Sequence, residues 1–327
     1  MSHEITKIDR QDGTEMAWHK LTKINPKLTL RNSWLNEWDI QKERLSIVGA
    51  GGIIRETDFH MLTATDDPKI QIGVPLADSY VPINNQAFIE CIENATLGID
   101  GLKLKSVGSI MGRNRVFASF EIGAANFTHG KRNFESFINF SNAHDKSGVF
   151  LANTSNTCIV CANTFAMNLQ YKGKTVHIRV RHTKNAQIAL ENMEEIIGGA
   201  LGAQAEFKQI FESLDEIKTN ETEARFAFAG FIGQGKEMST RASNTVERLT
   251  DLFNTGAGNK GETRADVFSA VTDFYSHESS GKGENRMKQW VSSEFGSGAV
   301  KKREFLQSIT EDYSGLIKKG VESLSLN

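Results

Sequence analysis

Basic side chains recur at three places in the middle of the chain, each within a pattern that predicts a turn or a strand. Two arginines lie in Gly112-Arg113-Asn114-Arg115, between apolar runs typical of a β-hairpin. Lys131 and Arg132 lie in a second polar turn, and residues 176–182 alternate apolar and basic side chains. Guanidinium and ammonium groups bind phosphate oxygens, so these residue types indicate contact with a polyanion.

The positive charge is concentrated in one segment. Residues 101–184 contain twelve Lys or Arg against three acidic residues, which is a net charge of +9. The whole chain carries −2, so the remaining residues together carry −11. A near-neutral total therefore conceals a strong separation of charge, which indicates an anionic partner.

Alternation along the predicted strands places the basic side chains on one face of a sheet. Every second side chain of residues 176–182 points the same way, and residues 102–107 alternate in the same manner. We therefore expect a basic sheet face that binds the phosphates of nucleic acid, with single-stranded DNA favoured. The expected contact residues are Lys103, Lys105, Arg113, Arg115, Lys131, Arg132, Arg179, Arg181, His182 and Lys184.

Aromatic side chains near these cations offer surfaces for base stacking. Phe117, Phe127, Tyr171 and the N-terminal tryptophans are the candidates, although most rings of the segment are expected to lie in the core. The alternative for the arginines of residues 112–115 is an exposed turn without a specific partner. Arg181 to Lys184 precede a predicted helix, whose N-terminus attracts anions. The competing interpretation is that His182 and Thr183 cap and pack that helix.

A second hypothesis is an enzyme that uses His144, Asp145, His177 and His182 around a metal ion or as general acid and base, with nucleic acid or nucleotides as substrate. The chain has no H-E-x-x-H motif and no paired D-x-D. Cys158 and Cys161 form a lone C-x-x-C without the second ligand pair of a structural zinc site, so buried thiols are favoured there. We therefore expect no catalytic residue, no metal site and no cofactor.

The hydrophobic pattern predicts an α+β protein in two parts. The first, residues 1–184, is an antiparallel β-rich domain with hairpins and an irregular N-terminal arm, and the second, residues 185–327, is mainly helical. Glycines at residues 49–52 predict a turn between strands. Further strands are expected at residues 53–64, 69–74, 79–82 and 175–181, and helices at 85–97, 165–170, 185–218, 221–233, 241–254, 263–276, 284–294 and 299–324.

The overall composition is that of an ordinary folded protein, with 39% hydrophobic and 24% charged residues. No apolar run approaches the roughly 18 to 20 residues of a membrane span, and the first residues lack a secretory signal, so we expect a cytoplasmic protein without membrane contact. Three cysteines fit reduced thiols better than a disulfide framework.

The order of several short pieces resembles a family of phage- and plasmid-like proteins of unassigned function, carried by phages, prophages and conjugative plasmids. The similarity covers most of the chain, in the right order, and no single motif is specific. The matching pieces are Met16-Ala17-Trp18-His19, Cys161-Ala162-Asn163-Thr164, Arg181-His182-Thr183, residues 265–274, Arg286 and residues 295–299.

This resemblance implies a cytosolic protein of mobile-element DNA metabolism, and it implies no reaction or catalytic residue. The basic turn at residues 112–115 also looks like the basic hairpins of single-strand annealing proteins, by charge and architecture alone. Annealing, recombination or replication is therefore the expected role, with a homo-oligomer as the suitable assembly. A third hypothesis is a counter-defence protein that binds a host partner.

Overall fold

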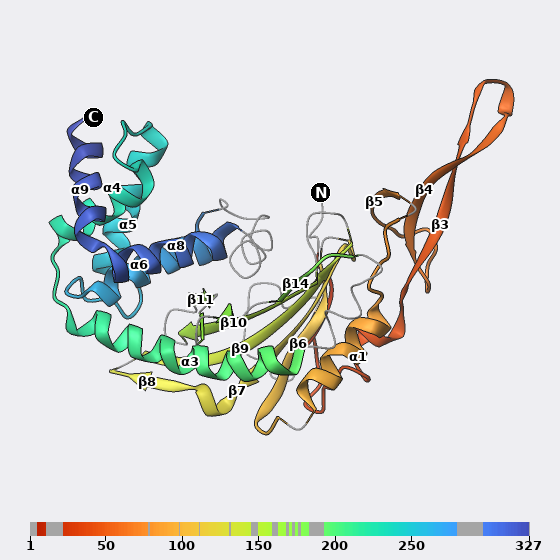
Figure 1. Ribbon diagram of the computed structural model, residues 1–327, viewed down its shortest axis with the longest axis horizontal. Helices are drawn as coiled ribbons and strands as arrows, with labels where there is room; N and C mark the ends of the chain where they lie inside the picture. Colours follow the sequence, from red (N-terminus) through yellow and green to blue (C-terminus); the bar gives the residue numbers. More distant parts are fainter. Residues whose placement is uncertain are drawn as a thin grey trace. The chain divides into compact units, whose positions relative to one another are not determined.

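The structure is a computed structural model. It describes residues 5–10, 22–77, 79–97, 99–110, 112–130, 132–144, 150–158, 163–167, 170–171, 174–175, 178–182, 193–279 and 297–326. The predicted α+β class is confirmed, because antiparallel sheets occupy the N-terminal and central parts and helices the C-terminal part (Figure 1). In the described part of the chain, no helix combines the length and the apolar character needed to cross a bilayer.

Contacts divide the chain into two interleaved compact units. The first unit comprises residues 1–124, 137–153 and 176–200, and the second comprises residues 125–136, 154–175 and 201–327. The long strands β9 (Arg132–Ala143) and β10 (Phe150–Cys158) and helix α3 (Met193–Glu216) contribute residues to both. The division therefore does not follow one cut between a β-rich and a helical part.

The main sheet of the first unit is antiparallel except where β1 (Ile5–Arg10) and β2 (Thr22–Ile24) pair in parallel. In it β10, β9, β7 (Arg115–Ile122), β6 (Leu102–Ile110), β1 and β2 lie side by side in this order, and β14 (Ile178–Val180) pairs with β10. Helix α1 (Asn85–Thr96) packs Phe88 against Phe150 with ring centroids 5.7 Å apart. The predicted hairpin around residues 112–115 and the predicted helix capped by Asn84 are confirmed.

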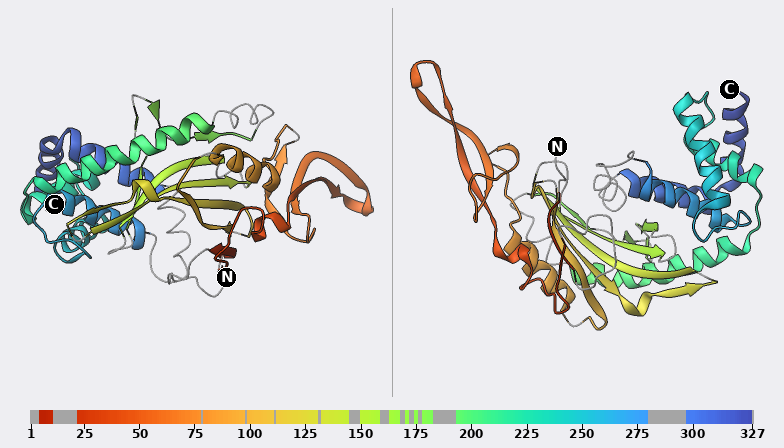
Figure 2. Two further views of the ribbon diagram at one scale, coloured as in Figure 1. Left: turned by 90° about the horizontal axis from the view of Figure 1, so that it is seen from below. Right: turned by 180° about the vertical axis from the view of Figure 1, so that it is seen from behind.

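A second sheet of the same unit contains β3 (Ile40–Val48), β4 (Ile54–Ala64) and β5 (Gln71–Ala77), in the order β3-β4-β5. Figures 1 and 2 show β3 and β4 as a long ribbon in orange. The predicted glycine turn is confirmed, because Gly51 and Gly52 adopt φ values of 76° and 79°, which favour glycine. The short helices η2 (Trp34–Glu37), η3 (Ala50–Gly52) and η4 (Gly123–Ala125) complete the local turns.

The second unit combines short strands with a helical bundle. Its strands are β8 (Phe127–His129), which pairs with β9, β11 (Asn163–Met167), which pairs with β10, and the small hairpin of β12 (Gln170–Tyr171) and β13 (Lys174–Thr175). Its helices besides α3 are α4 (Glu221–Gly233), α5 (Thr240–Thr255), α6 (Arg264–His277), α8 (Ser297–Glu311) and α9 (Tyr313–Ser325).

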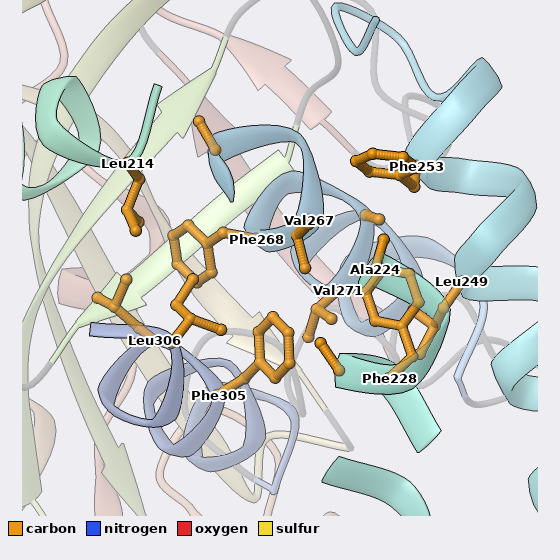
Figure 3. Close-up of a cluster of buried hydrophobic side chains, with 14 of the residues drawn as sticks. Leu214, Ala224, Phe228, Leu249, Phe253, Val267, Phe268, Val271, Phe305 and Leu306 are labelled. Carbon is orange, nitrogen blue, oxygen red and sulfur yellow. The ribbon is translucent and has the colours of Figure 1, made fainter. Parts of the chain in front are cut away.

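The core of this unit is aromatic and aliphatic, and Figure 3 shows Phe228, Val271 and Phe305 from three different helices turned toward one another. All three side chains are 0% exposed. Apolar burial of this kind is the main force that holds amphipathic helices in a bundle. Helices α4 and α9 approach most closely at glycines, because a Cβ atom at Gly320 would overlap the carbonyl oxygen of Phe226.

Four predicted elements are wrong, each for a local reason. The expected irregular N-terminal arm, residues 1–45, is wrong where the structure describes it, because β1 pairs with β6 and β3 already begins at Ile40. The expected helix at 165–170 is replaced by β11, whose backbone pairs with β10. Residues 79–82 form no strand, since Pro82 has no N–H to donate. The expected helix at 299–324 is interrupted at Asp312, whose carboxylate caps α9 by accepting the Gly315 N–H at 2.9 Å.

Candidate functional site

The strands β6, β7 and β9 present one polar and one apolar face within the first unit. Directly opposed residues of antiparallel strands point to the same face, and the pairing places Ser106, Ser119 and Asn139 in one row across the sheet. The neighbouring rows of this face are Lys103, Glu121 and Phe137, then Gly108, Phe117 and Ser141, then Ile110, Arg115 and Ala143. We call the side chains of these four rows the polar face.

Small polar groups hold this face together. The Ser119 hydroxyl donates to Asn139 Oδ1 at 2.6 Å, which joins β7 to β9 through side chains. The hydroxyl of Ser141 is buried, and none of the described residues hydrogen-bonds to it. Sequence reasoning missed these residues, although the alternation of Asn139, Phe140 and Ser141 along β9 was a usable signal.

The polar face carries some of the predicted contact cations. Lys103 is exposed, and Lys105 lies in a β-bulge beside it, where its Nζ forms an ion pair with Glu121 Oε2 at 3.2 Å. Arg115 lies at the far end of the same face and is 9% exposed. The backbone of Arg179 pairs with Leu151 on β10, and Arg181 follows β14 as an exposed residue.

Arg113 does not project from an exposed hairpin tip, and this expectation is corrected. Its guanidinium forms an ion pair with Asp66 at 2.6 Å and lies 4.9 Å and 4.6 Å from the ring centroids of Trp34 and Trp38. The hydrogen bond from Arg113 holds the pKa of Asp66 below its ordinary value. Arg113 therefore anchors the turn to the body of the unit, with cation–π contacts adding to the ion pair.

Arg132 is also inside the protein, within the second unit. Its guanidinium forms an ion pair with Asp266, donates to the carbonyl oxygen of Gly258 at 2.7 Å, and lies 3.5 Å from Asp215 Oδ1. Burial alone raises the pKa of Asp215, but hydrogen bonds from His129 and Thr263 and the charge of Arg132 lower it overall. The expected exposure of Arg132 is therefore wrong, because carboxylates of later helices neutralise it.

His182 lies on the apolar side of the sheet, in a buried polar cluster. Asn142 donates to the carbonyl oxygen of Ile83 at 2.6 Å, which leaves its Oδ1 at 2.7 Å from His182 Nε2. Because that oxygen only accepts, the proton of His182 resides on Nε2, and Nδ1 accepts a hydrogen bond from the Tyr80 hydroxyl. The centroid of the His144 ring lies 5.7 Å from that of the His182 ring.

Both histidines of this cluster are neutral. Burial, together with the neighbouring His182, lowers the pKa of His144 to about 3. Burial lowers the pKa of His182 to about 4. His182 is neutral and 7% exposed. It connects Tyr80 and Asn142 through hydrogen bonds and is not a cation that contacts phosphate. The expected contact of His182 with phosphate is therefore wrong, because the ring is uncharged and buried.

Several of the remaining predicted residues fall on parts of the chain that the structure does not describe. Lys131 and Lys184 lie outside the described residues, as do Asp145, His177 and Cys161. Cys158 ends β10, and the described part of the chain contains no group of three metal-ligating side chains. Among the candidate stacking rings, Phe117, Trp34 and Trp38 are buried, and Phe127 stacks on Phe134 with centroids 4.5 Å apart. Trp18 and the side chain of Tyr171 lie outside the part of the chain that the structure describes.

No curated protein and no solved structure is significantly similar to the chain. A family model described as a domain of unknown function, DUF932, matches residues 75–302. This range covers the polar face, the histidine cluster and most of the helical bundle. The matched residues make up more than half of the sequence, and the chain therefore belongs to the DUF932 family.

Proposed function

We propose that this protein is a non-catalytic binder of nucleic acid, with single-stranded DNA as the favoured ligand. The expected setting is the DNA metabolism of a mobile element, such as annealing, recombination or replication. The observation that carries the proposal is the grouping of Lys103, Lys105 and Arg115 on one face of the sheet, where Lys103 is exposed. Phosphate groups spaced along a strand are a suitable partner for cations spread over several β-strands.

The charge of the following segment supports the same ligand. No acidic residue occurs between Asp145 and Glu191, whereas six basic residues do. Arg181 is exposed at the end of β14, so at least one of these charges is accessible to a ligand. The six residues are Lys146, Lys172, Lys174, Arg179, Arg181 and Lys184.

The cations that lie close together in the sequence have separate roles. Arg113 and Arg132 stabilise the fold through Asp66 and Asp266, and His182 stabilises it through Tyr80. Contact with phosphate is assigned to Lys103 and Arg181, which are exposed. Lys105 is paired with Glu121, and Arg115 is 9% exposed, so neither is assigned a direct contact. For Arg179 the proposed contact rests on the sequence. Lys131 and Lys184 remain proposed contacts by sequence alone.

The test is binding of a fluorescent oligothymidylate, measured by anisotropy at low salt. The variant Lys103→Glu with Arg181→Glu should weaken binding by roughly tenfold or more, since two phosphate contacts become repulsive. The matched control is Lys69→Glu with Lys236→Glu, which makes the same charge change at two exposed residues outside the proposed surface. Equal weakening by both double variants would show that only net charge matters, and unchanged binding of the first would refute the proposed surface.

A metal-dependent enzyme acting on nucleic acid or nucleotides is the second candidate, because two of its four predicted residues lie together. His144 and His182 are in ring contact, and both ring nitrogens of His144 are buried without a hydrogen-bond partner among the described residues. Neutral imidazole nitrogens are good ligands for Zn²⁺ and related metals. Metal analysis of the purified protein by mass spectrometry, with a nuclease assay in Mg²⁺ or Mn²⁺, tests this role. Metal-dependent cleavage that is lost in His144→Ala would favour it over simple binding.

A further inference from the structure

Strands β3 and β4 extend as a two-stranded ribbon beyond the rest of their sheet. Strand β5 pairs with β4 only from Phe59 to Thr63, whereas β3 and β4 remain paired as far as Val48 and Ile54 (Figures 1 and 2). The distance along the strand from Phe59 to Ile54 is about 17 Å at roughly 3.3 Å per residue. An isolated two-stranded ribbon is only marginally stable in water, so this extension needs a partner surface.

The tip of this ribbon is apolar and exposed. Ile47, Val48, Ile53 and Ile54 are 61%, 70%, 57% and 70% exposed, and no charged residue occurs between Arg44 and Arg55. We call these four side chains the tip. Soluble proteins rarely expose contiguous apolar side chains in this way unless another molecule covers them.

Two further apolar side chains are exposed at the root of the ribbon, on the paired strands β4 and β5. Phe59 on β4 is 50% exposed, and Val74 on β5 is 42% exposed. We call these two side chains the root. Between tip and root is a band of mixed charge, in which Arg44 pairs with Glu56 at 2.9 Å and lies 3.9 Å from Asp58.

We infer that the ribbon docks on the ribbon of a second copy of this chain, tip against root in both directions. Two ribbons that lie antiparallel about a two-fold axis bring each tip onto the partner's root, so the apolar side chains of tip and root are covered at once. The bands of mixed charge then meet at the axis, where the cations of one copy face the carboxylates of the other. A strongly anionic or cationic partner would find no opposite charge at the tip, because the tip carries no charged side chain.

Sedimentation equilibrium of the nuclease-treated full chain tests this inference. The wild-type chain should form a dimer, and Val48→Lys with Ile54→Lys should weaken it by roughly 100-fold or more, because each lost apolar contact occurs twice in a two-fold interface. The root variant Phe59→Lys should weaken it as well. Leu97→Lys is the control, since Leu97 is 79% exposed in the same unit but lies outside the ribbon.

A cross-link identifies the geometry. A disulfide requires Cα atoms within about 7 Å, so cysteines placed at Val48 and Phe59 are too far apart to join within one chain. Oxidation of Val48→Cys with Phe59→Cys should therefore give a covalent dimer, and neither single variant should do so.

Three results would overturn the inference. They are a monomer at every concentration, a dimer that tolerates the tip variant, and a dimer that Leu97→Lys weakens equally. A monomer whose tip binds vesicles of phosphatidylcholine would assign the tip to a lipid surface instead.

Discussion

Replacing Arg132 by methionine separates the structural cations from the binding cations. Methionine keeps the apolar stem but removes the guanidinium that forms the ion pair with Asp266 and donates to Asn259 Oδ1 at 3.2 Å. Asp266 is 2% exposed, so its carboxylate would remain buried next to an apolar side chain. Its other oxygen accepts the Thr263 N–H at 3.2 Å as part of a capping box, which keeps the carboxylate in place.

The expected loss follows from this burial. Removing one partner of a buried ion pair costs about 3–5 kcal/mol, because the remaining charge is uncompensated. We therefore expect Arg132→Met to lower the free energy of unfolding of the second unit by about 4 kcal/mol, a large part of the roughly 5–15 kcal/mol typical of a domain. The control Lys208→Met removes an exposed helical pair with Glu212 and should cost at most about 0.5 kcal/mol.

Urea unfolding followed by far-ultraviolet circular dichroism measures the difference, because the helices of the second unit dominate that signal. Adding Asp266→Asn to Arg132→Met should recover part of the loss, since it removes the stranded charge. If Arg132→Met lowered the free energy of unfolding by less than about 1 kcal/mol, the buried ion pair would be refuted, and Arg132 would again be a candidate for an exposed cation.

Two further predictions concern the histidine cluster and the contact between α4 and α9. His144 and His182 have folded pKa values of about 3 and about 4, below the ordinary 6.5, so the unfolded chain binds protons first as the pH falls. The free energy of unfolding should therefore fall from pH 6.5 toward pH 4, and each histidine should account for a loss of about 2 kcal/mol at pH 5. The variant His182→Gln should show a smaller drop in urea midpoint over this pH range than the wild-type chain. An equal drop in that variant would contradict the assignment. Gly320→Ala should lower the free energy of unfolding by about 3 kcal/mol, because its methyl group would overlap the Phe226 carbonyl. Gly123→Ala is its control, since the nearest atom there is 3.8 Å away, and equal stability of the two variants in thermal unfolding would argue against the close helix contact.

Local patterns predicted much of the fold because local interactions determine those elements. The helices α4, α5 and α6 begin directly after Asn220, Ser239 and Thr263, whose side chains each accept a backbone N–H of the first turn. Such caps are visible in the sequence. Strand β11 was missed because its conformation depends on pairing with β10, which no local pattern records.

The candidate site was predictable only in part. Alternation along β6 and β7 correctly indicated a hairpin and a shared face for its polar side chains. It did not reveal that Arg113 meets a carboxylate 47 residues away, or that Arg132 meets one 134 residues away. Charge counted along a segment therefore overestimates the charge of a surface, because tertiary contacts neutralise part of it.

The salt dependence of oligothymidylate binding tests the central claim most directly. For a single-stranded ligand, the logarithm of the binding constant falls with the logarithm of salt concentration with a slope of about −0.7 for each phosphate contact. The account predicts a steep slope for the wild-type chain, and a slope reduced by about 0.7 in Lys103→Gln and again in Arg181→Gln. A slope near zero in the wild-type chain, or one that neither substitution changes, would contradict the assignment of the polar face and Arg181 to nucleic acid.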